Sequence, residues 1–233
     1  MSLRDYTRAN EFDRMVGVLQ TENVLDHAVG TSILDVGCGI GEYTYLYTNK
    51  FTRVVGLDPS LACIKEARKE TDSIEYVHGY GETFDLEERF DVISLNNVLE
   101  HVDDPIKLLK NCKKHLAKNG RLIVQVPNAE SVTRRLGVLM NLIPSLKHMS
   151  EKEVIYYGHK RTYTYSSLYK ECSKAGLKVI HPGGILYKPL PNEILLNLCA
   201  TNGAEWTNKF IDALMAFGED RPDECACIYC VCQ

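Results

Sequence analysis

The chain has 233 residues, of which 45% are hydrophobic and 25% charged, with a formal net charge of −4 at pH 7. This balance is typical of a soluble globular protein and excludes a disordered, collagen-like or coiled-coil chain. The net charge attracts neither nucleic acid nor an anionic membrane, so we expect no nucleic-acid partner. No segment approaches the ~18 apolar residues that span a bilayer, so we expect no membrane span.

The first predicted element is a helix. From about Arg8 to Val29, apolar residues return to one helical face. The preceding segment, Met1–Asn10, is polar and lacks the apolar stretch of a signal peptide. The nine cysteines are an odd number and mostly lie in apolar runs, which is typical of reduced, buried thiols. We therefore expect a cytoplasmic protein without a disulfide framework.

Five short runs rich in β-branched residues come next and alternate with helix-like stretches. They are Ser32–Val36, Arg53–Leu57, Ile74–Val77, Phe90–Ser94 and Leu122–Val126. Such runs are typical of strands buried on both faces of a parallel sheet. Their alternation with helices predicts right-handed βαβ units and a doubly wound α/β sheet.

The helices between these strands carry end signals. Ser60 is expected to cap a helix that reaches about Glu70. Asp104-Pro105 is expected to begin another, whose apolar stripe runs to Leu116 and which ends before Gly120.

Two insertions interrupt the alternation after Pro127. Residues 128–162 combine basic, apolar and Tyr-rich pieces without a sheet pattern. A helix from about Ser166 to Ala175 and a strand at Leu177–Ile180 follow. Residues 183–222 then contain two predicted helices, near Glu193–Ala200 and Glu205–Phe217. We expect a single domain over 1–233, with residues 30–127 as its core.

The strongest local motif is a glycine-rich loop, Asp35-Val36-Gly37-Cys38-Gly39-Ile40-Gly41-Glu42. It follows a predicted strand and is expected to open a helix, where backbone N–H groups approach a ligand closely. The dinucleotide fingerprint G-x-G-x-x-G is not matched, because the third glycine comes one residue early. The spacing disfavours a nicotinamide site, and a purely structural turn is the alternative.

A second acid, Asp58, ends the second predicted strand, 17 residues after Gly41. An acid at the tip of that strand can accept hydrogen bonds from both ribose hydroxyls of a nucleoside. The alternative is a helix cap, because the position fits both roles.

Together with Gly79-Tyr80-Gly81-Glu82 and Asn97-Val98-Leu99-Glu100-His101-Val102, these motifs resemble the class I (Rossmann-like) S-adenosylmethionine-dependent methyltransferases. The branch they most resemble includes ubiquinone-biosynthesis and sugar-tailoring methyltransferases. The resemblance implies a seven-stranded, mostly parallel sheet with an antiparallel last strand. It also implies helical lids over the acceptor at 128–162 and 183–222, S-adenosyl-L-methionine as cofactor and S-adenosyl-L-homocysteine as product.

The same resemblance implies the cofactor-binding residues. The three loop glycines and Asp35 would hold the methionine part of the cofactor. Asp58 would hold the ribose, and Asn96 would lie against the methionyl group. The remaining residues would surround the adenine. The full set is Asp35, Gly37, Gly39, Gly41, Asp58, Pro59, Ser60, Gly81, Glu82 and Asn96.

Two histidines are candidate bases. His101 follows the fourth predicted strand, and the imidazole pKa of ~6.5 suits proton removal near neutral pH. His159 lies at the end of the first insertion. The alternatives are a structural turn around His101 and a helix-entry loop with solvated charges around His159. Candidate acceptor-binding residues around the second histidine are Tyr157, His159, Arg161 and Tyr163, with Lys160 as another cation.

The terminal run Cys225–Cys232 is β-prone and continuous, whereas zinc sites need turns between paired cysteines. We expect a buried strand and no metal.

The predicted function is methyl transfer to a small-molecule acceptor, through an oxygen, with a sugar or related metabolite as one candidate. The alternatives are N-methylation of a small amine and a non-catalytic cofactor-binding protein. We expect a monomer or homodimer whose partner is the acceptor.

Overall fold

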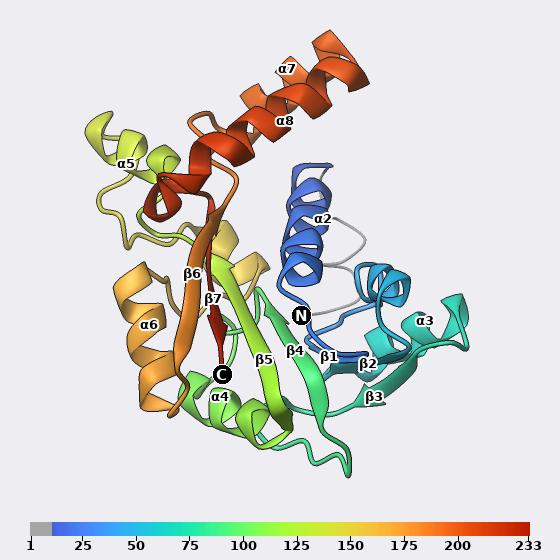
Figure 1. The fold of residues 1–233 in the computed structure, drawn as a ribbon. Helices are drawn as coiled ribbons and strands as arrows, with labels where there is room; N and C mark the ends of the chain where they lie inside the picture. The colour runs from blue at the N-terminus through green and yellow to red at the C-terminus, as the bar shows by residue number, and fades with distance from the viewer. Residues whose placement is uncertain (1–10) are drawn as a thin grey trace.

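The computed structural model describes residues 11–233, and its centre is a seven-stranded sheet in the order β3-β2-β1-β4-β5-β7-β6 (Figure 1). Strand β7 is antiparallel to β5 and β6, and the other pairings are parallel. This confirms the predicted α/β sheet with its antiparallel last strand. The strands are β1 Ser32–Val36, β2 Arg53–Asp58, β3 Glu75–His78, β4 Phe90–Asn96, β5 Leu116–Pro127, β6 Val179–Ile185 and β7 Cys227–Cys232.

Helices cover both faces of the sheet. They are α2 Glu11–Asp26, α3 Leu61–Glu70, α4 Pro105–Lys114, α5 Val132–Leu139, α6 Tyr165–Lys174, α7 Asn192–Asn202 and α8 Ala204–Glu219, with short turns η1 Thr44–Asn49, η2 Lys152–Tyr156 and η3 Pro222–Glu224. In Figure 1, α4 and α6 lie on one side of the sheet, and the α7–α8 hairpin projects from its upper end. None of the helices in this part of the chain is long and apolar enough to cross a membrane.

The sheet has a hydrophobic core on each of its two faces, and alternate residues of the central strands pack into one core or the other. Leu34, Ile93 and Cys230 pack in the cluster that includes residues of α4 and α6. Their chain neighbours Ile33 and Val92 pack in the other cluster, with residues of α2, α3, α7 and α8. The strands are therefore buried on both faces, which is why they were recognisable as continuous apolar runs.

The parallel register gathers the carboxyl ends of the strands at one edge. Asp35 of β1 pairs with Gly56 of β2 on one side and with Ser94 of β4 on the other. Asn96, the last residue of β4, pairs with Gln125 of β5. Polar side chains from segments far apart in sequence therefore meet at this edge, where ligands bind in open α/β sheets.

Several boundaries differ from the prediction. Helix α4 ends at Lys114, and Leu116 already belongs to β5, where it pairs with Phe90. Gly120 lies within β5, where a Cβ would come 3.0 Å from the carbonyl oxygens of Ala117 and Phe90. The glycine is therefore required by a crowded strand rather than by a helix end.

The glycine loop opens the 3₁₀ turn η1 rather than the predicted α-helix. The segment before Arg53 is short and rich in tyrosine and threonine, which favour α-helix poorly. Strand β6 extends to Ile185, so the second insertion begins later than residue 183. The predicted first helix corresponds to α2, and its residues 8–10 and the segment Met1–Asn10 lie outside the described residues.

Candidate functional site

The glycine loop joins β1 to η1 at the carboxyl edge of the sheet. Gly37, Gly39 and Gly41 have φ angles of 84°, 57° and 82°, the left-handed region that favours glycine. A side chain would also collide with Val98 at the first position and with Tyr76 at the third. The loop thus brings bare backbone close to its surroundings, which is the property that a ligand cradle needs.

Asp35, near the end of β1, connects the start of this loop to neighbouring segments through hydrogen bonds. Its carboxylate accepts hydrogen bonds from the hydroxyls of Thr44 and Ser94, both at 2.6 Å. The group is 5% exposed, and burial raises its pKa. Asp35 therefore connects η1 and β4 to the strand that carries the loop, and these two hydroxyl partners were not predicted from the sequence.

Asp58, at the end of β2, faces the glycine loop. One carboxylate oxygen accepts from the Gly39 amide at 3.0 Å, and the other accepts from the Ser60 amide at 2.7 Å. An ionised carboxylate has about four acceptor positions, so two remain for ligand hydroxyls. Burial raises the pKa of Asp58. The cap of α3 is Ser60, whose hydroxyl accepts from the Cys63 amide at 3.3 Å, so Asp58 is not the helix cap.

The predicted adenine side is formed by two turns. Pro59 accepts a hydrogen bond at its carbonyl from the His78 ring at 3.0 Å, which joins the end of β3 to the start of α3. Gly81 lies against α4, where a Cβ would come 2.5 Å from Leu108. Glu82 follows it in the same turn and is partly exposed. Tyr80 is 61% exposed.

Asn96 belongs to a network of amide side chains. Its side-chain nitrogen donates to the Tyr47 hydroxyl at 3.0 Å, and its oxygen accepts from Gln125 at 2.6 Å. Gln125 also donates to the backbone carbonyl of Gln20 at 2.9 Å and accepts from Asn23 at 3.2 Å. Helix α2 is thus bonded to the carboxyl ends of β4 and β5. Apart from Asn96, sequence reasoning missed these residues.

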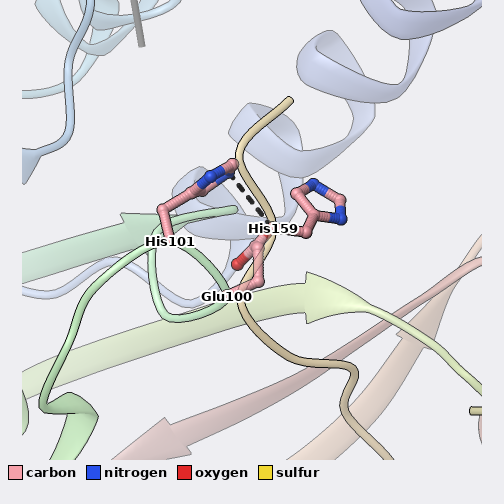
Figure 2. Close-up of side chains that lie close together, drawn as sticks. All are labelled: Glu100, His101 and His159. Carbon is pink, nitrogen blue, oxygen red and sulfur yellow. Dashed lines mark ion pairs between the residues drawn. The ribbon is translucent and has the colours of Figure 1, made fainter. Parts of the chain in front are cut away.

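The two candidate histidines lie side by side, although they are far apart in sequence. His101, in the loop after β4, and His159, in the first insertion, have ring centroids 4.9 Å apart (Figure 2). Burial and the neighbouring His159 lower the pKa of His101 to about 4, and burial lowers that of His159. Both imidazoles are therefore neutral at physiological pH.

Glu100 completes this cluster. Its carboxyl is 1% exposed, has no hydrogen-bond partner within the described chain, and lies 3.9 Å from the His101 ring. Burial raises its pKa to about 8. A cavity of about 20 Å³, lined in part by Arg134, Glu153 and Arg161, adjoins it.

The ligand atoms of Glu100, His101 and His159 lie within 4.8 Å of one another, so these residues could hold a metal ion. The prediction of no metal did not consider this grouping. The absence of a bound metal therefore remains a prediction.

The other predicted acceptor-binding residues are placed differently. Arg161 donates to the carbonyls of Leu99 at 3.0 Å and Val102 at 2.6 Å, so it braces the loop after β4 instead of presenting a free cation. Tyr163 is 1% exposed and donates to Glu171 at 2.8 Å, so it is part of the core, and it also lines the small cavity beside Glu100. Tyr157 stacks on His159 with ring centroids 5.8 Å apart, and its hydroxyl donates to Asp13 of α2 at 3.4 Å.

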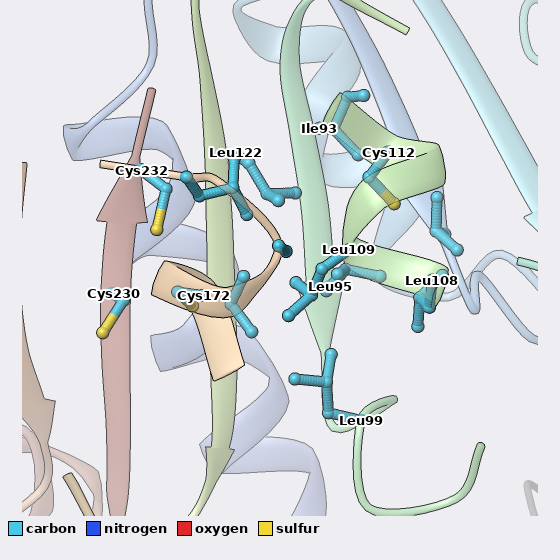
Figure 3. Close-up of a cluster of buried hydrophobic side chains, with 14 of the residues drawn as sticks. Ile93, Leu95, Leu99, Leu108, Leu109, Cys112, Leu122, Cys172, Cys230 and Cys232 are labelled. Carbon is cyan, nitrogen blue, oxygen red and sulfur yellow. The ribbon is translucent and has the colours of Figure 1, made fainter. Parts of the chain in front are cut away.

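The terminal cysteines form a buried strand, as predicted. Cys230 and Cys232 of β7 lie beside Cys172 of α6 in the core (Figure 3). All nine cysteines are free. Within residues 11–233, no cysteine takes part in a grouping of three potential metal ligands.

Comparisons with known proteins agree with this geometry. A family model described as "Methyltransferase domain" matches residues 8–182. A ubiquinone biosynthesis O-methyltransferase of Rhodopseudomonas palustris (strain BisA53) is 26% identical over 178 residues, covering 72% of this chain and 67% of the relative. One from Nitrobacter winogradskyi is 28% identical over 174 residues, covering 71% of this chain and 63% of the relative. The chain thus spans about two thirds of the length of these relatives.

Among solved structures, an S-adenosylmethionine-dependent methyltransferase of Thermotoga maritima superimposes with a TM-score of 0.64. The sequence identity is 19%, and the match covers 94% of this chain and 89% of that chain. At this identity the likeness shows a shared fold.

Proposed function

This chain belongs to the methyltransferase domain family, the class I S-adenosylmethionine-dependent methyltransferases, and on that premise we propose that it methylates an oxygen of a small-molecule acceptor. The family match covers the glycine loop, Asp58 and both candidate histidines. The curated relatives named above are O-methyltransferases, which supports oxygen as the methylated atom.

The single observation that carries the proposal is the hydrogen bond between the glycine loop and the carboxylate of Asp58. The loop has three glycines at positive φ and so presents backbone without side chains, and its Gly39 amide holds the carboxylate of Asp58 on the adjacent strand in place. A ligand with a hydroxyl-bearing sugar and a zwitterionic methionine end fits a bare loop beside a fixed acid. We assign the methionine end to the glycine loop and Asn96, and the ribose to Asp58.

When bound, the cofactor supplies a methyl group on an activated sulfonium. The protein must hold the acceptor in line and take up the proton that a hydroxyl releases. His101 is the proposed base, because it follows the carboxyl end of β4 and its ring packs edge-on against His159. His159 and Tyr157 are proposed to line the acceptor side, since they stack beside it.

The segments 128–162 and 183–222, the latter without the end of β6, are proposed as the acceptor lid within one domain over 1–233. The contact between Tyr157 and Asp13 supports this, because it links the first insertion to α2. We also propose a cytoplasmic location, which the nine free cysteines support, and a monomer or homodimer.

The test is product formation. The purified chain is incubated with S-adenosylmethionine and a panel of phenolic, sugar and amine acceptors, and S-adenosylhomocysteine is measured by mass spectrometry. We expect release with a hydroxyl acceptor and a loss of at least about a hundredfold in His101→Ala, the low end for a general base. Release with amines alone would contradict O-methylation, and binding without release from any acceptor would favour a non-catalytic protein.

A further inference from the structure

Helix α2 is joined to the carboxyl edge by a reciprocal pair of amides. The Gln20 side-chain nitrogen donates to the Asn97 oxygen at 3.1 Å, and the Asn97 nitrogen donates to the Gln20 oxygen at 2.9 Å. The two residues are 77 positions apart in sequence. Gln20 is 2% exposed, so this is a two-point contact in the interior. Buried polar groups are costly unless paired, and here each amide is the partner of the other, so loss of either leaves its partner unpaired.

Asn97 itself has an unusual backbone. Its φ of 53° is in the left-handed region, which is uncommon for a residue other than glycine. Its amide donates to the Gln125 carbonyl at 2.9 Å, so β5 holds it in this conformation. Such conformations cluster at functional sites, where the surroundings enforce them. The residue directly follows Asn96, the proposed contact to the methionyl group.

The same helix also touches the glycine loop. Arg14 lies 3.8 Å from Glu42, the residue after the last loop glycine. Three residues further on, a Cβ on Gly17 would collide with the Tyr43 ring, so helix and loop are in close contact. Helix α2 therefore spans the two walls, the glycine loop and the end of β4, between which the methionine end is proposed to lie.

We propose that the Gln20–Asn97 pair is a latch by which α2 fixes the carboxyl end of β4 for cofactor binding, and that Gln20 is a positioning residue. This rests on the proposed function. The latch holds Asn97, whose backbone sets the direction of Asn96, and the Gln125 bonds hold Asn96 from the other side.

The test is a double-mutant cycle on S-adenosylhomocysteine binding, measured by calorimetry. Gln20→Met keeps the side-chain length without the amide, and Asn97→Gly keeps access to positive φ without the amide. The control is Glu22→Gln, on the exposed side of α2. We expect each single variant to weaken binding about tenfold, the loss of about 1.4 kcal/mol, and the double variant to be little weaker than either. Hydrogen exchange in α2 should rise in all three and not in the control.

The outcomes separate the two claims. Singles that bind as tightly as the wild type, with only the melting temperature lowered, would mean a structural pair and overturn the latch. Independent, additive losses would also overturn it, because the two amides would not act as a unit. If Gln20→Met does not fold, Asn97→Gly alone decides. No binding by the folded wild type would overturn the proposed function, and the latch with it.

Discussion

Asp58 is held by two backbone amides, so its carboxylate is positioned before any ligand arrives. Replacing it with alanine removes both the ligand contact and the brace on the glycine loop. We predict that Asp58→Ala weakens S-adenosylhomocysteine binding by about 2 kcal/mol, the scale of hydrogen bonds to a charged group. Calorimetry measures this, with the exposed Asp72→Ala as the control. Equal affinities for the two variants would mean that Asp58 only supports the loop.

Glu100 predicts a pH dependence of stability. Burial raises its pKa to about 8 in the folded protein, above the ordinary carboxyl value. Its contribution to stability is therefore fully present at low pH and is lost as the pH rises through about 8. The pKa values of His101 and His159 are lowered, so those residues reduce stability only as the pH falls below about 6.5. These histidines therefore contribute no change between about pH 6.5 and 8, and comparison with a variant that lacks the carboxyl removes the contribution of the buried thiols, whose pKa values burial raises.

In that window we predict that the free energy of unfolding falls by about 2 kcal/mol in the wild type relative to Glu100→Gln. Glutamine has nearly the same shape as glutamate and does not titrate, so the Glu100→Gln variant is the matched control for the wild type. Urea unfolding at the two pH values measures the difference. Parallel profiles for the two proteins would show that the Glu100 carboxyl titrates normally.

At the scale of elements, the loop after β4 depends on two adjacent cations in different roles. Arg161 donates to three carbonyls of that loop, whereas Lys160 forms an exposed ion pair with Asp103 at 2.5 Å. We predict that Arg161→Ala lowers the free energy of unfolding by about 2 kcal/mol, because the carbonyls lose a charged donor. Lys160→Ala should cost less than about 1 kcal/mol. Thermal and urea unfolding check both, and equal losses would remove the bracing role of Arg161.

Strand β7 offers a second test at this scale. Cys230 of β7 is fully buried on the face of the sheet that α6 covers, while Cys199 on α7 is partly exposed. We predict that Cys230→Ser lowers the free energy of unfolding by about 1–3 kcal/mol, because a hydroxyl is costlier to bury than a thiol. Cys199→Ser should stay within about 0.5 kcal/mol of the wild type. An undiminished stability of Cys230→Ser would argue against the tightly packed strand.

At the scale of the whole molecule, the predicted elements can be compared with the observed ones. The central strands and the caps Ser60 and Asp104 follow from local composition, so they were predicted correctly. The boundary between α4 and β5 was wrong, because pairing with Phe90 overrides the helical periodicity at Leu116.

The site was predictable only in part. The cofactor-side candidates follow strand ends, and the parallel register places them along one edge of the sheet. The amide network joins residues up to 105 positions apart, and the carbonyl partners of Arg161 lie 58 to 62 positions away. Spacing along the chain carries no signal for such contacts. Burial is equally invisible in the sequence: Tyr163 is 1% exposed and packs in the core beside the small cavity at Glu100.

The central claim is that the glycine loop, Asp58 and Asn96 form one S-adenosylmethionine site. The most direct measurement is a calorimetric titration of the purified chain with S-adenosylhomocysteine in the presence of a chelator, alongside a titration with NADH. The account predicts saturable binding of S-adenosylhomocysteine at one molecule per chain, a higher melting temperature with the ligand, as binding to the folded state requires, and no binding of NADH. A folded sample that binds neither S-adenosylhomocysteine nor S-adenosylmethionine, or that binds NADH instead, would contradict it.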